Sequence, residues 1–212
     1  MRKITILIVD DHKIVRIGLK SLFSAEKDLV VVGEAEDGEI AVKEALRLKP
    51  DVVIMDIVMP KSDGVITTQE LRQKLPETKI LVLTSYSTSD AIAAALAAGA
   101  SGAVMKSADD NDLLSAIRSV AAGKFFISSE VEGLLAVDPP APTLSNRQQE
   151  VLQSLVKGFN NAEIAAQLGI SRTVVKEHVE TLLMKLGAAN RTELTAIAIR
   201  KHLLERGGRV TA

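Results

Sequence analysis

The first 125 or so residues of the chain repeat one pattern, in which a short apolar run is followed by a stretch with helical spacing. The apolar runs are Ile4–Val9, Leu29–Gly33, Val52–Met55, Ile80–Thr84 and Gly102–Met105. The helix-like stretches lie near residues 13–24, 38–48, 64–75, 89–98 and 110–122. Alternation of strands and helices indicates βαβ units, and runs that are apolar throughout indicate strands buried on both faces. The sequence therefore predicts an α/β domain with a doubly wound, five-stranded parallel sheet.

Composition narrows the chemistry that such a domain can carry. Aromatic residues make up only 2% of the chain, so the core must be aliphatic. Cysteine is absent, which excludes disulfides, thiolate metal sites and cysteine nucleophiles. No apolar stretch approaches the roughly 18 residues of a membrane helix. We therefore expect a soluble, cytoplasmic protein with no membrane partner.

The pattern changes after residue 127, where we predict a second domain. Three prolines, Pro139, Pro140 and Pro142, cannot continue a helix and favour an extended chain. From residue 144 onward the spacing is purely helical, and Gly169 separates a short helix from a longer one that Ser171 caps. Two helices joined by a tight glycine turn are typical of a helix-turn-helix. The predicted organisation is an α/β domain at 1–127, a linker at 128–142 and a small all-α domain at 143–207.

Polar side chains follow the predicted strands at the point where each strand ends. Asp10 and Asp11 follow the first strand, Asp56 the third and Lys106 the fifth, while Thr84 ends the fourth. In a doubly wound sheet, ligands bind beyond the carboxyl ends of the strands. Each of these residues alone also fits a helix cap or a solvated loop. Their coincidence at four strand ends predicts one shared crevice.

A crevice of this composition suits phosphoryl acceptance. Three carboxylates repel one another unless a cation lies among them, and Mg²⁺ is a hard cation that prefers oxygen ligands. A carboxylate can act as nucleophile and form an aspartyl-phosphate. Asp56 is the best candidate, because it ends the most central run, VVIMD. Lys106 would neutralise the phosphoryl oxygens and Thr84 would donate a hydrogen bond to one of them.

The same residues carry a resemblance to the receiver domain of response regulators. The motifs are VDDH, MDIVMPKSDG, LTS and GAxGxxxK, and the match spans residues 4–122. The resemblance implies the strand order 2-1-3-4-5 and Asp56 as the phosphoacceptor for a sensor histidine kinase. It also implies Mg²⁺ held by Asp11, Asp56 and the backbone carbonyl of Val58, with Asp10 in support. Thr84 and Lys106 would sense the phosphoryl group.

The chain departs from the receiver pattern near Lys106. Family members usually carry an aromatic switch residue three positions before the lysine, and this chain has Ala103 there. A proline usually follows the lysine, and this chain has Ser107. Neither change touches the phosphorylation chemistry. Both bear on how phosphorylation is transmitted to the rest of the chain.

The longer helix of the second domain is a candidate recognition helix, reading SRTVVKEHVETLLMKLG. Residues 142–212 carry 10 Lys/Arg against 6 Asp/Glu, a mild excess of positive charge that suits a polyanion. The residues that we expect to contact DNA are Ser171, Arg172, Thr173, Lys176, Glu177, His178, Lys185 and Arg191. A small helical bundle with a solvated charged face also fits the pattern, and Glu177 favours that alternative because acids repel phosphates.

The second domain resembles the LuxR-type DNA-binding domain over residues 143–204, from LSNRQQEVL to ANRTEL. Departures include Val174 in place of the usual Thr and Glu177 in place of a polar Asn or Thr. Loss of the Thr hydroxyl removes a phosphate contact, and Glu177 can accept from a cytosine amino group instead. A receiver followed by a LuxR-type domain is similar to the NarL/FixJ class of response regulators. That class implies DNA, a sensor histidine kinase, RNA polymerase and a second copy of the chain as partners.

Three functions are consistent with these features. The first is a transcription factor switched by phosphorylation of Asp56, with no enzymatic activity beyond slow self-dephosphorylation. The second is a phosphorylation-independent DNA-binding regulator that uses its receiver for docking or dimerisation, as Ala103 suggests. The third is a Mg²⁺-dependent phosphatase of the haloacid type. Such a phosphatase needs a second Asp two residues after its nucleophile, where this chain has Val58.

Overall fold

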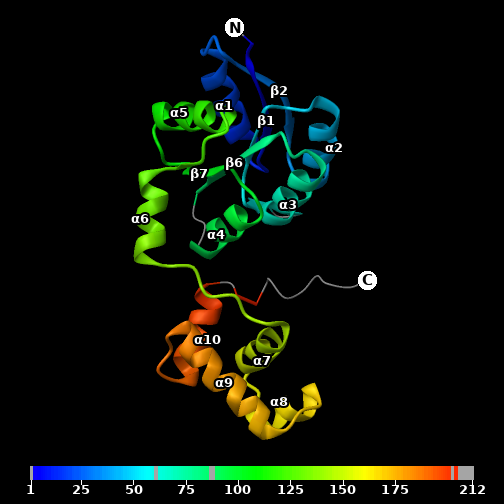
Figure 1. Ribbon diagram of the computed structural model, residues 1–212, viewed down its shortest axis with the longest axis vertical. Coiled ribbons are helices and arrows are strands. Elements are labelled where there is room, and N and C mark those ends of the chain that lie inside the picture. Colours follow the sequence, from blue (N-terminus) through cyan, green and yellow to red (C-terminus); the bar gives the residue numbers. More distant parts are fainter. Residues whose placement is uncertain (1, 60–61, 86–88, 202, 205–212) are drawn as a thin grey trace. The chain divides into compact units, whose positions relative to one another are not determined.

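The computed structural model describes residues 2–59, 62–85, 89–201 and 203–204 (Figure 1). The chain forms two compact units, residues 1–140 and residues 141–212. The first unit contains a parallel sheet with helices on both faces, and the second contains helices (Figure 1). None of the helices in the described part of the chain is both long and apolar enough to cross a membrane.

The sheet of the first unit is parallel throughout, with the order β2-β1-β3-β6-β7-β8. Its strands are β1 Ile4–Val9, β2 Leu29–Ala35, β3 Val52–Met55, β6 Lys79–Thr84, β7 Gly102–Met105 and β8 Phe126–Ile127. The first five of these strands reproduce the predicted order 2-1-3-4-5, which confirms the predicted fold. Two further strands, β4 Val58–Met59 and β5 Ser62–Asp63, form a separate antiparallel pair beyond β3.

Helices cover both faces of the sheet (Figure 1). The helices of this unit are α1 Lys13–Ser24, α2 Gly38–Leu48, α3 Gly64–Lys74, α4 Ser89–Ala97, α5 Asp110–Ala121 and α6 Ser129–Val137. Ile54 packs in one apolar cluster with Phe23 of α1 and Ile117 of α5, while Met55 packs in another with Leu71 of α3. Successive residues of a strand point to opposite faces. Burial on both faces therefore explains why these runs are apolar throughout.

A sixth strand and a further helix extend the α/β unit beyond the sequence-based prediction. β8 pairs with β7, and Gly102 permits this approach, because an added Cβ there would lie 2.3 Å from the carbonyl oxygen of Phe126. α6 occupies most of the segment expected to be a linker, and its Val131 is fully buried. The prolines that argued for an extended chain lie after this helix.

In the part of the second unit that the structure describes, the helices are α7 Asn146–Val156, α8 Asn161–Leu168, α9 Arg172–Leu186 and α10 Arg191–Arg200. Asn160 and Glu163 form the predicted capping box at the start of α8. Gly169 ends α8 in the left-handed conformation (φ 65°), and the Ser171 side chain caps α9. The apolar faces of α7, α8, α9 and α10 enclose one core that includes Leu152, Ile164, Val175, Leu182 and Leu194. The α8–α9 pair is the predicted helix-turn-helix.

Candidate functional site

The carboxyl ends of four neighbouring strands hold the polar residues of the α/β unit. Asp10 follows β1, Asp56 follows β3, Thr84 ends β6 and Lys106 follows β7. These strands are consecutive in the sheet. Backbone hydrogen bonds continue the ladder past the strand ends, from Asp56 N to the Val9 oxygen (2.9 Å) and from Lys106 N to the Thr84 oxygen (2.8 Å). The four strand ends therefore form one continuous edge.

Lys106 joins two of the carboxylates in this crevice. Its Nζ lies 2.5 Å from Asp10 Oδ2 and 2.6 Å from Asp56 Oδ2. Asp10 and Asp56 are 2% and 4% exposed, so both carboxylates are nearly removed from solvent. Burying a charge costs several kcal/mol unless a partner of opposite charge is present. The ammonium group therefore makes the burial of these carboxylates tolerable.

Burial and charge shift the titration of this group of residues. Burial raises the pKa of the Asp56 carboxyl above its ordinary value, and Asp10 acts in the same direction, while Lys106 and the Val58 N–H oppose it. Burial opposes the charged form of Lys106. Its hydrogen bonds to Asp10 and Asp56 outweigh that effect and raise the pKa of the amine. The pocket thus holds more negative charge than its one ammonium can balance.

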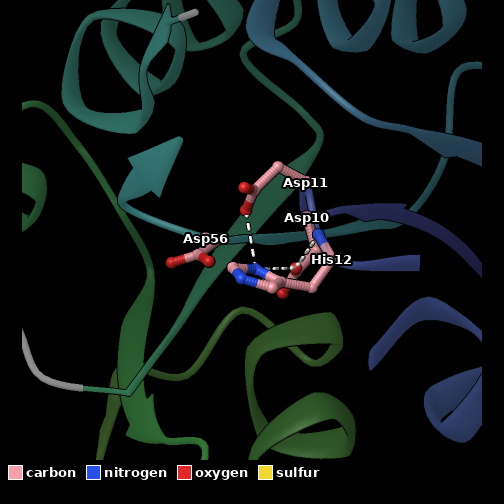
Figure 2. A group of neighbouring side chains, drawn as sticks. All are labelled: Asp10, Asp11, His12 and Asp56. Atoms are coloured by element: carbon pink, nitrogen blue, oxygen red, sulfur yellow. Dashed lines mark hydrogen bonds and ion pairs between the residues drawn. The ribbon is translucent and has the colours of Figure 1, made fainter. Parts of the chain in front are cut away.

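Asp11 and His12 complete the acidic side of the pocket (Figure 2). His12 Nδ1 lies 2.8 Å from Asp11 Oδ1 and 3.4 Å from Asp10 Oδ1. Asp10, Asp11, His12 and Asp56 each offer one ligand atom, and these atoms lie within 4.8 Å of one another. The three carboxylates fit a hard divalent cation such as Mg²⁺. His12 was not among the residues predicted for the site, although it stands inside the VDDH motif.

The chain just after Asp56 folds tightly around its carboxylate. The Val58 backbone N–H donates to Asp56 Oδ1 (3.2 Å), while the Val58 side chain is largely exposed. Gly64 donates its N–H to the Ile57 oxygen (3.0 Å), and an added Cβ there would lie 2.3 Å from the Asp56 carbonyl oxygen. Only glycine fits at position 64 with this backbone. The segment brings the Val58 backbone to the pocket, and the role of its carbonyl remains a prediction.

Thr84 and Ala103 lie on the two strands that complete the crevice. Thr84 is 1% exposed at the end of β6. Ala103, in the middle of β7, is fully buried in an apolar cluster with Ile57, Ile92 and Val131. The Ser128 N–H at the start of α6 donates to the Ala103 oxygen (3.1 Å). Val131 of α6 thus belongs to the same packed cluster as Ala103, the position where the receiver pattern usually has an aromatic residue.

In the helical unit, the first turns of α9 present most of the predicted DNA-contacting side chains to solvent. Ser171, Arg172, Thr173, Lys176 and Glu177 are exposed, while His178 is half-buried. Lys176 Nζ lies 3.8 Å from Glu180 Oε1, one turn further along the helix. The buried residues of α9, Val175 and Leu182, lie on its other side. The exposed face is polar and of mixed charge.

Two of the predicted DNA-contacting cations are engaged within the helical unit. Lys185 Nζ donates to the Thr143 carbonyl oxygen (3.0 Å) and to Gln148 Oε1 (3.1 Å). Arg191 donates to Asn161 Oδ1 (3.3 Å) and to the Phe159 carbonyl oxygen. These side chains satisfy backbone carbonyls in the connections between helices. Their contact with DNA remains a prediction.

The fold and the two sites together define a receiver-type α/β unit followed by a helix-turn-helix unit. Residues 6–118 match the family model described as response regulator receiver domain, and residues 142–198 match the model of bacterial regulatory proteins, luxR family. The chain therefore belongs to the two-component response regulators with a LuxR-type DNA-binding domain, of the NarL/FixJ class.

Individual relatives agree with this assignment. The chain is 34% identical to the transcriptional regulatory protein LiaR of Bacillus subtilis (strain 168), over 95% of this chain and 99% of LiaR. It is 36% identical to the oxygen regulatory protein NreC of Staphylococcus aureus (strain bovine RF122 / ET3-1), over 94% of this chain and 99% of NreC. RcsB from Salmonella enterica serovar Typhimurium, solved on promoter DNA with a phosphomimetic, has a TM-score of 0.71. It is 29% identical, with coverage of 92% of this chain and 98% of that chain.

Proposed function

We propose that this response regulator is a transcription factor controlled by phosphorylation of Asp56. The observation that carries the proposal is the position of Lys106 Nζ, 2.6 Å from the Asp56 carboxylate and 2.5 Å from that of Asp10. A buried carboxylate beside a fixed ammonium and further acids matches what phosphoryl transfer needs, namely positioning and charge neutralisation. The donor would be a sensor histidine kinase, the usual partner of a receiver.

Each pocket residue has a distinct part in the proposed reaction. An Asp56 carboxylate oxygen attacks the phosphorus of the donor, the new P–O bond forms, and the bond to the donor's imidazole nitrogen or acyl oxygen breaks. Lys106 pairs with the phosphoryl oxygens, and the Thr84 hydroxyl donates to one of them. Asp10, Asp11, Asp56 and the Val58 carbonyl would hold a Mg²⁺ ion. When bound, this ion offsets the negative charge that the carboxylates and the phosphoryl group bring together.

The exposed start of α9 would contact DNA in the major groove. Arg172, Thr173 and Lys176 lie on that face with Ser171 at the helix N-terminus, which itself attracts phosphates. We expect two copies to bind paired half-sites, because LuxR-type regulators such as RcsB have been solved as dimers on DNA. Because a transcription factor must reach the chromosome, we expect the protein in the cytoplasm. We expect it to act on transcription through RNA polymerase.

A second candidate function is regulation without phosphorylation, with the receiver used for docking or dimerisation. The observation that favours it is Ala103, which is fully buried with Val131 in one apolar cluster. A side chain this small has no ring to swing inward when Thr84 moves. A variant Asp56→Asn with full regulatory activity would favour this function over the first.

Labelling with a small phosphodonor tests the proposal. The intact protein is incubated with acetyl phosphate, with and without Mg²⁺, and its mass is measured. We expect one added phosphoryl group on the wild type with Mg²⁺ and none on Asp56→Asn.

Asp63→Asn is the matched control for this labelling. Asp63 lies near Asp56 in sequence and caps α3 through its side chain, and asparagine caps equally well. This variant should be labelled as the wild type is. Labelling of Asp56→Asn to the same extent as the wild type would contradict the proposal. Labelling of the wild type that does not depend on Mg²⁺ would also contradict it.

A further inference from the structure

A buried arginine contacts the backbone of the acidic pocket. Arg16 of α1 is 8% exposed. Its NH1 group donates to the carbonyl oxygen of Asp10 (2.7 Å), and its Nε donates to Glu34 Oε2 (3.3 Å). Asp10 is therefore held at both ends, since its carboxylate pairs with Lys106 and its carbonyl accepts from Arg16.

The turn that Arg16 contacts carries two of the pocket carboxylates and leads directly into α1, and within it the His12 N–H donates to Asp10 Oδ1 (2.8 Å). α1 begins directly after His12, whose side chain makes no cap hydrogen bond. The backbone of Asp10 is fixed on one side by its N–H, which donates to the Ala35 oxygen of β2 (3.2 Å). Arg16 reaches back from the second turn of α1 and fixes the Asp10 carbonyl. The Asp10 backbone is thus held through both its N–H and its carbonyl oxygen.

Glu34 in turn holds Arg16 in place. Its Oε2 accepts from Arg16 and lies 3.1 Å from Lys20 Nζ. The hydrogen bond from Lys20, together with the one from Arg16, holds the pKa of Glu34 below its usual range. A planar guanidinium can donate to a carboxylate and to a carbonyl in fixed directions, whereas a lysine ammonium is a point charge on a flexible stem. The site therefore suits arginine specifically.

We propose that Arg16 is a positioning residue for the cation-binding pocket, acting through the Asp10 backbone to hold the Asp10–Asp11 turn in its ligand-binding arrangement. This inference rests on the proposed function, because it concerns the same pocket. Groups that orient metal ligands from outside typically change metal affinity 10- to 100-fold when they are removed. Arg16 does not touch the reacting atoms, so its removal should leave the chemistry at Asp56 intact once the cation is bound.

Calorimetric titration of the full chain with MgCl₂ tests the inference. We expect the Kd for Mg²⁺ to rise about 10- to 100-fold in Arg16→Met. Arg16→Lys, which keeps a donor and a positive charge, should recover part of the affinity. Arg118→Met is the matched control, because Arg118 pairs with Asp28 and Glu26 at the surface, and its Kd should equal that of the wild type.

The dependence of labelling rate on Mg²⁺ separates positioning from a merely structural role. If Arg16 positions the turn, Arg16→Met is labelled slowly by acetyl phosphate at low Mg²⁺ and at the wild-type rate when Mg²⁺ saturates. If Arg16 only stabilises the fold, the labelled fraction falls equally at all Mg²⁺ concentrations, and the proposal is overturned. A wild-type Kd in Arg16→Met also overturns it.

Three further outcomes also distinguish the possible explanations. If Arg16→Met does not fold, Glu34→Met removes the partner that orients Arg16, and a rise in Kd supports the proposal while an unchanged Kd overturns it. If the wild type neither binds Mg²⁺ nor takes up phosphate, the proposed function itself fails, and the role of Arg16 fails with it. A wild type that does both, beside an unaffected Arg16→Met, overturns only the inference about Arg16.

Discussion

Lys106 and Asp56 stand 50 positions apart in the chain, yet the lysine Nζ lies 2.6 Å from the aspartate Oδ2 in a nearly solvent-free pocket. This contact exists because β3 and β7 are parallel strands of one sheet whose carboxyl ends share an edge. The pairing neutralises part of the negative charge of the pocket before any phosphate arrives.

Replacing Lys106 by methionine should strongly destabilise the α/β unit when Mg²⁺ is absent. The substitution leaves Asp10 and Asp56 buried without their cation, and breaking a buried ion pair in this way costs about 3–5 kcal/mol. Urea unfolding in EDTA measures the loss. Lys74→Met is the control, because the exposed pair of Lys74 with Glu70 contributes about 0.5 kcal/mol or less. A loss for Lys106→Met no larger than for the control would contradict the account of the pocket.

Asp56→Asn should change how stability depends on pH. Because the folded-state pKa of Asp56 is raised above 3.8, its ionised form is less stable in the fold than in the unfolded chain. The protonated Asp56 carboxyl therefore contributes fully to the stability of the wild type below pH 3.8. That contribution is lost as the pH rises through the folded-state pKa of Asp56. In EDTA, the stability of Asp56→Asn relative to the wild type should rise over that interval and then level off. If the difference in free energy of unfolding between Asp56→Asn and the wild type does not vary with pH, the pKa of the Asp56 carboxyl is not raised by folding.

Ala103→Phe, which restores the usual aromatic of the receiver class, should destabilise this chain. The space around Ala103 is filled by Ile57, Ile92 and Val131, and overpacking a core costs about 1–3 kcal/mol. Adding Val131→Ala should recover part of the loss, because the smaller residue makes room for the ring. Thermal unfolding of the two single variants and the double variant measures this coupling. If the stability changes of the two single variants simply add up in the double variant, Val131 does not occupy the space that the ring of Ala103→Phe needs.

Lys176 and Lys185 on α9 should behave differently when each is replaced by alanine. Lys176 is exposed, and loss of one phosphate contact should reduce the slope of log Kobs against log salt by about 0.9. Lys185 already bonds the Thr143 carbonyl and Gln148, so its loss should lower the free energy of unfolding by about 1 kcal/mol. DNA titrations at several salt concentrations and urea unfolding separate the two effects. A reduced salt slope in Lys185→Ala would place that residue on the DNA instead.

Local signals in the sequence predicted much of this molecule. Apolar runs predicted β1, β2, β3, β6 and β7 because helices cover both faces of the sheet. Asn160, Gly169 and Ser171 marked the ends of helices because capping is a local interaction. The bonding of Arg16 to the Asp10 carbonyl and Glu34, and of Lys185 to Thr143, depends on groups that only the tertiary fold brings together.

The structure of the segment after α5 also depends on contacts that only the tertiary fold brings together. Helix α6 and strand β8 were not predicted, because their short apolar stretches are stabilised by packing on β7 rather than by their own sequence pattern. The sequence places Ala103 where the receiver pattern usually has an aromatic residue. The reason that a small residue fits there, the burial of Val131 in the same cluster, requires the fold.

Mapping the modified residue tests most directly whether Asp56 takes up phosphate in a cation-dependent pocket. The wild type is labelled with acetyl phosphate and Mg²⁺, the acyl phosphate is reduced with borohydride to a stable alcohol, and peptides are sequenced by mass spectrometry. The account predicts reduction at residue 56 alone, abolished by EDTA. Reduction at Asp10 or Asp11, or at residue 56 equally with EDTA, would contradict it.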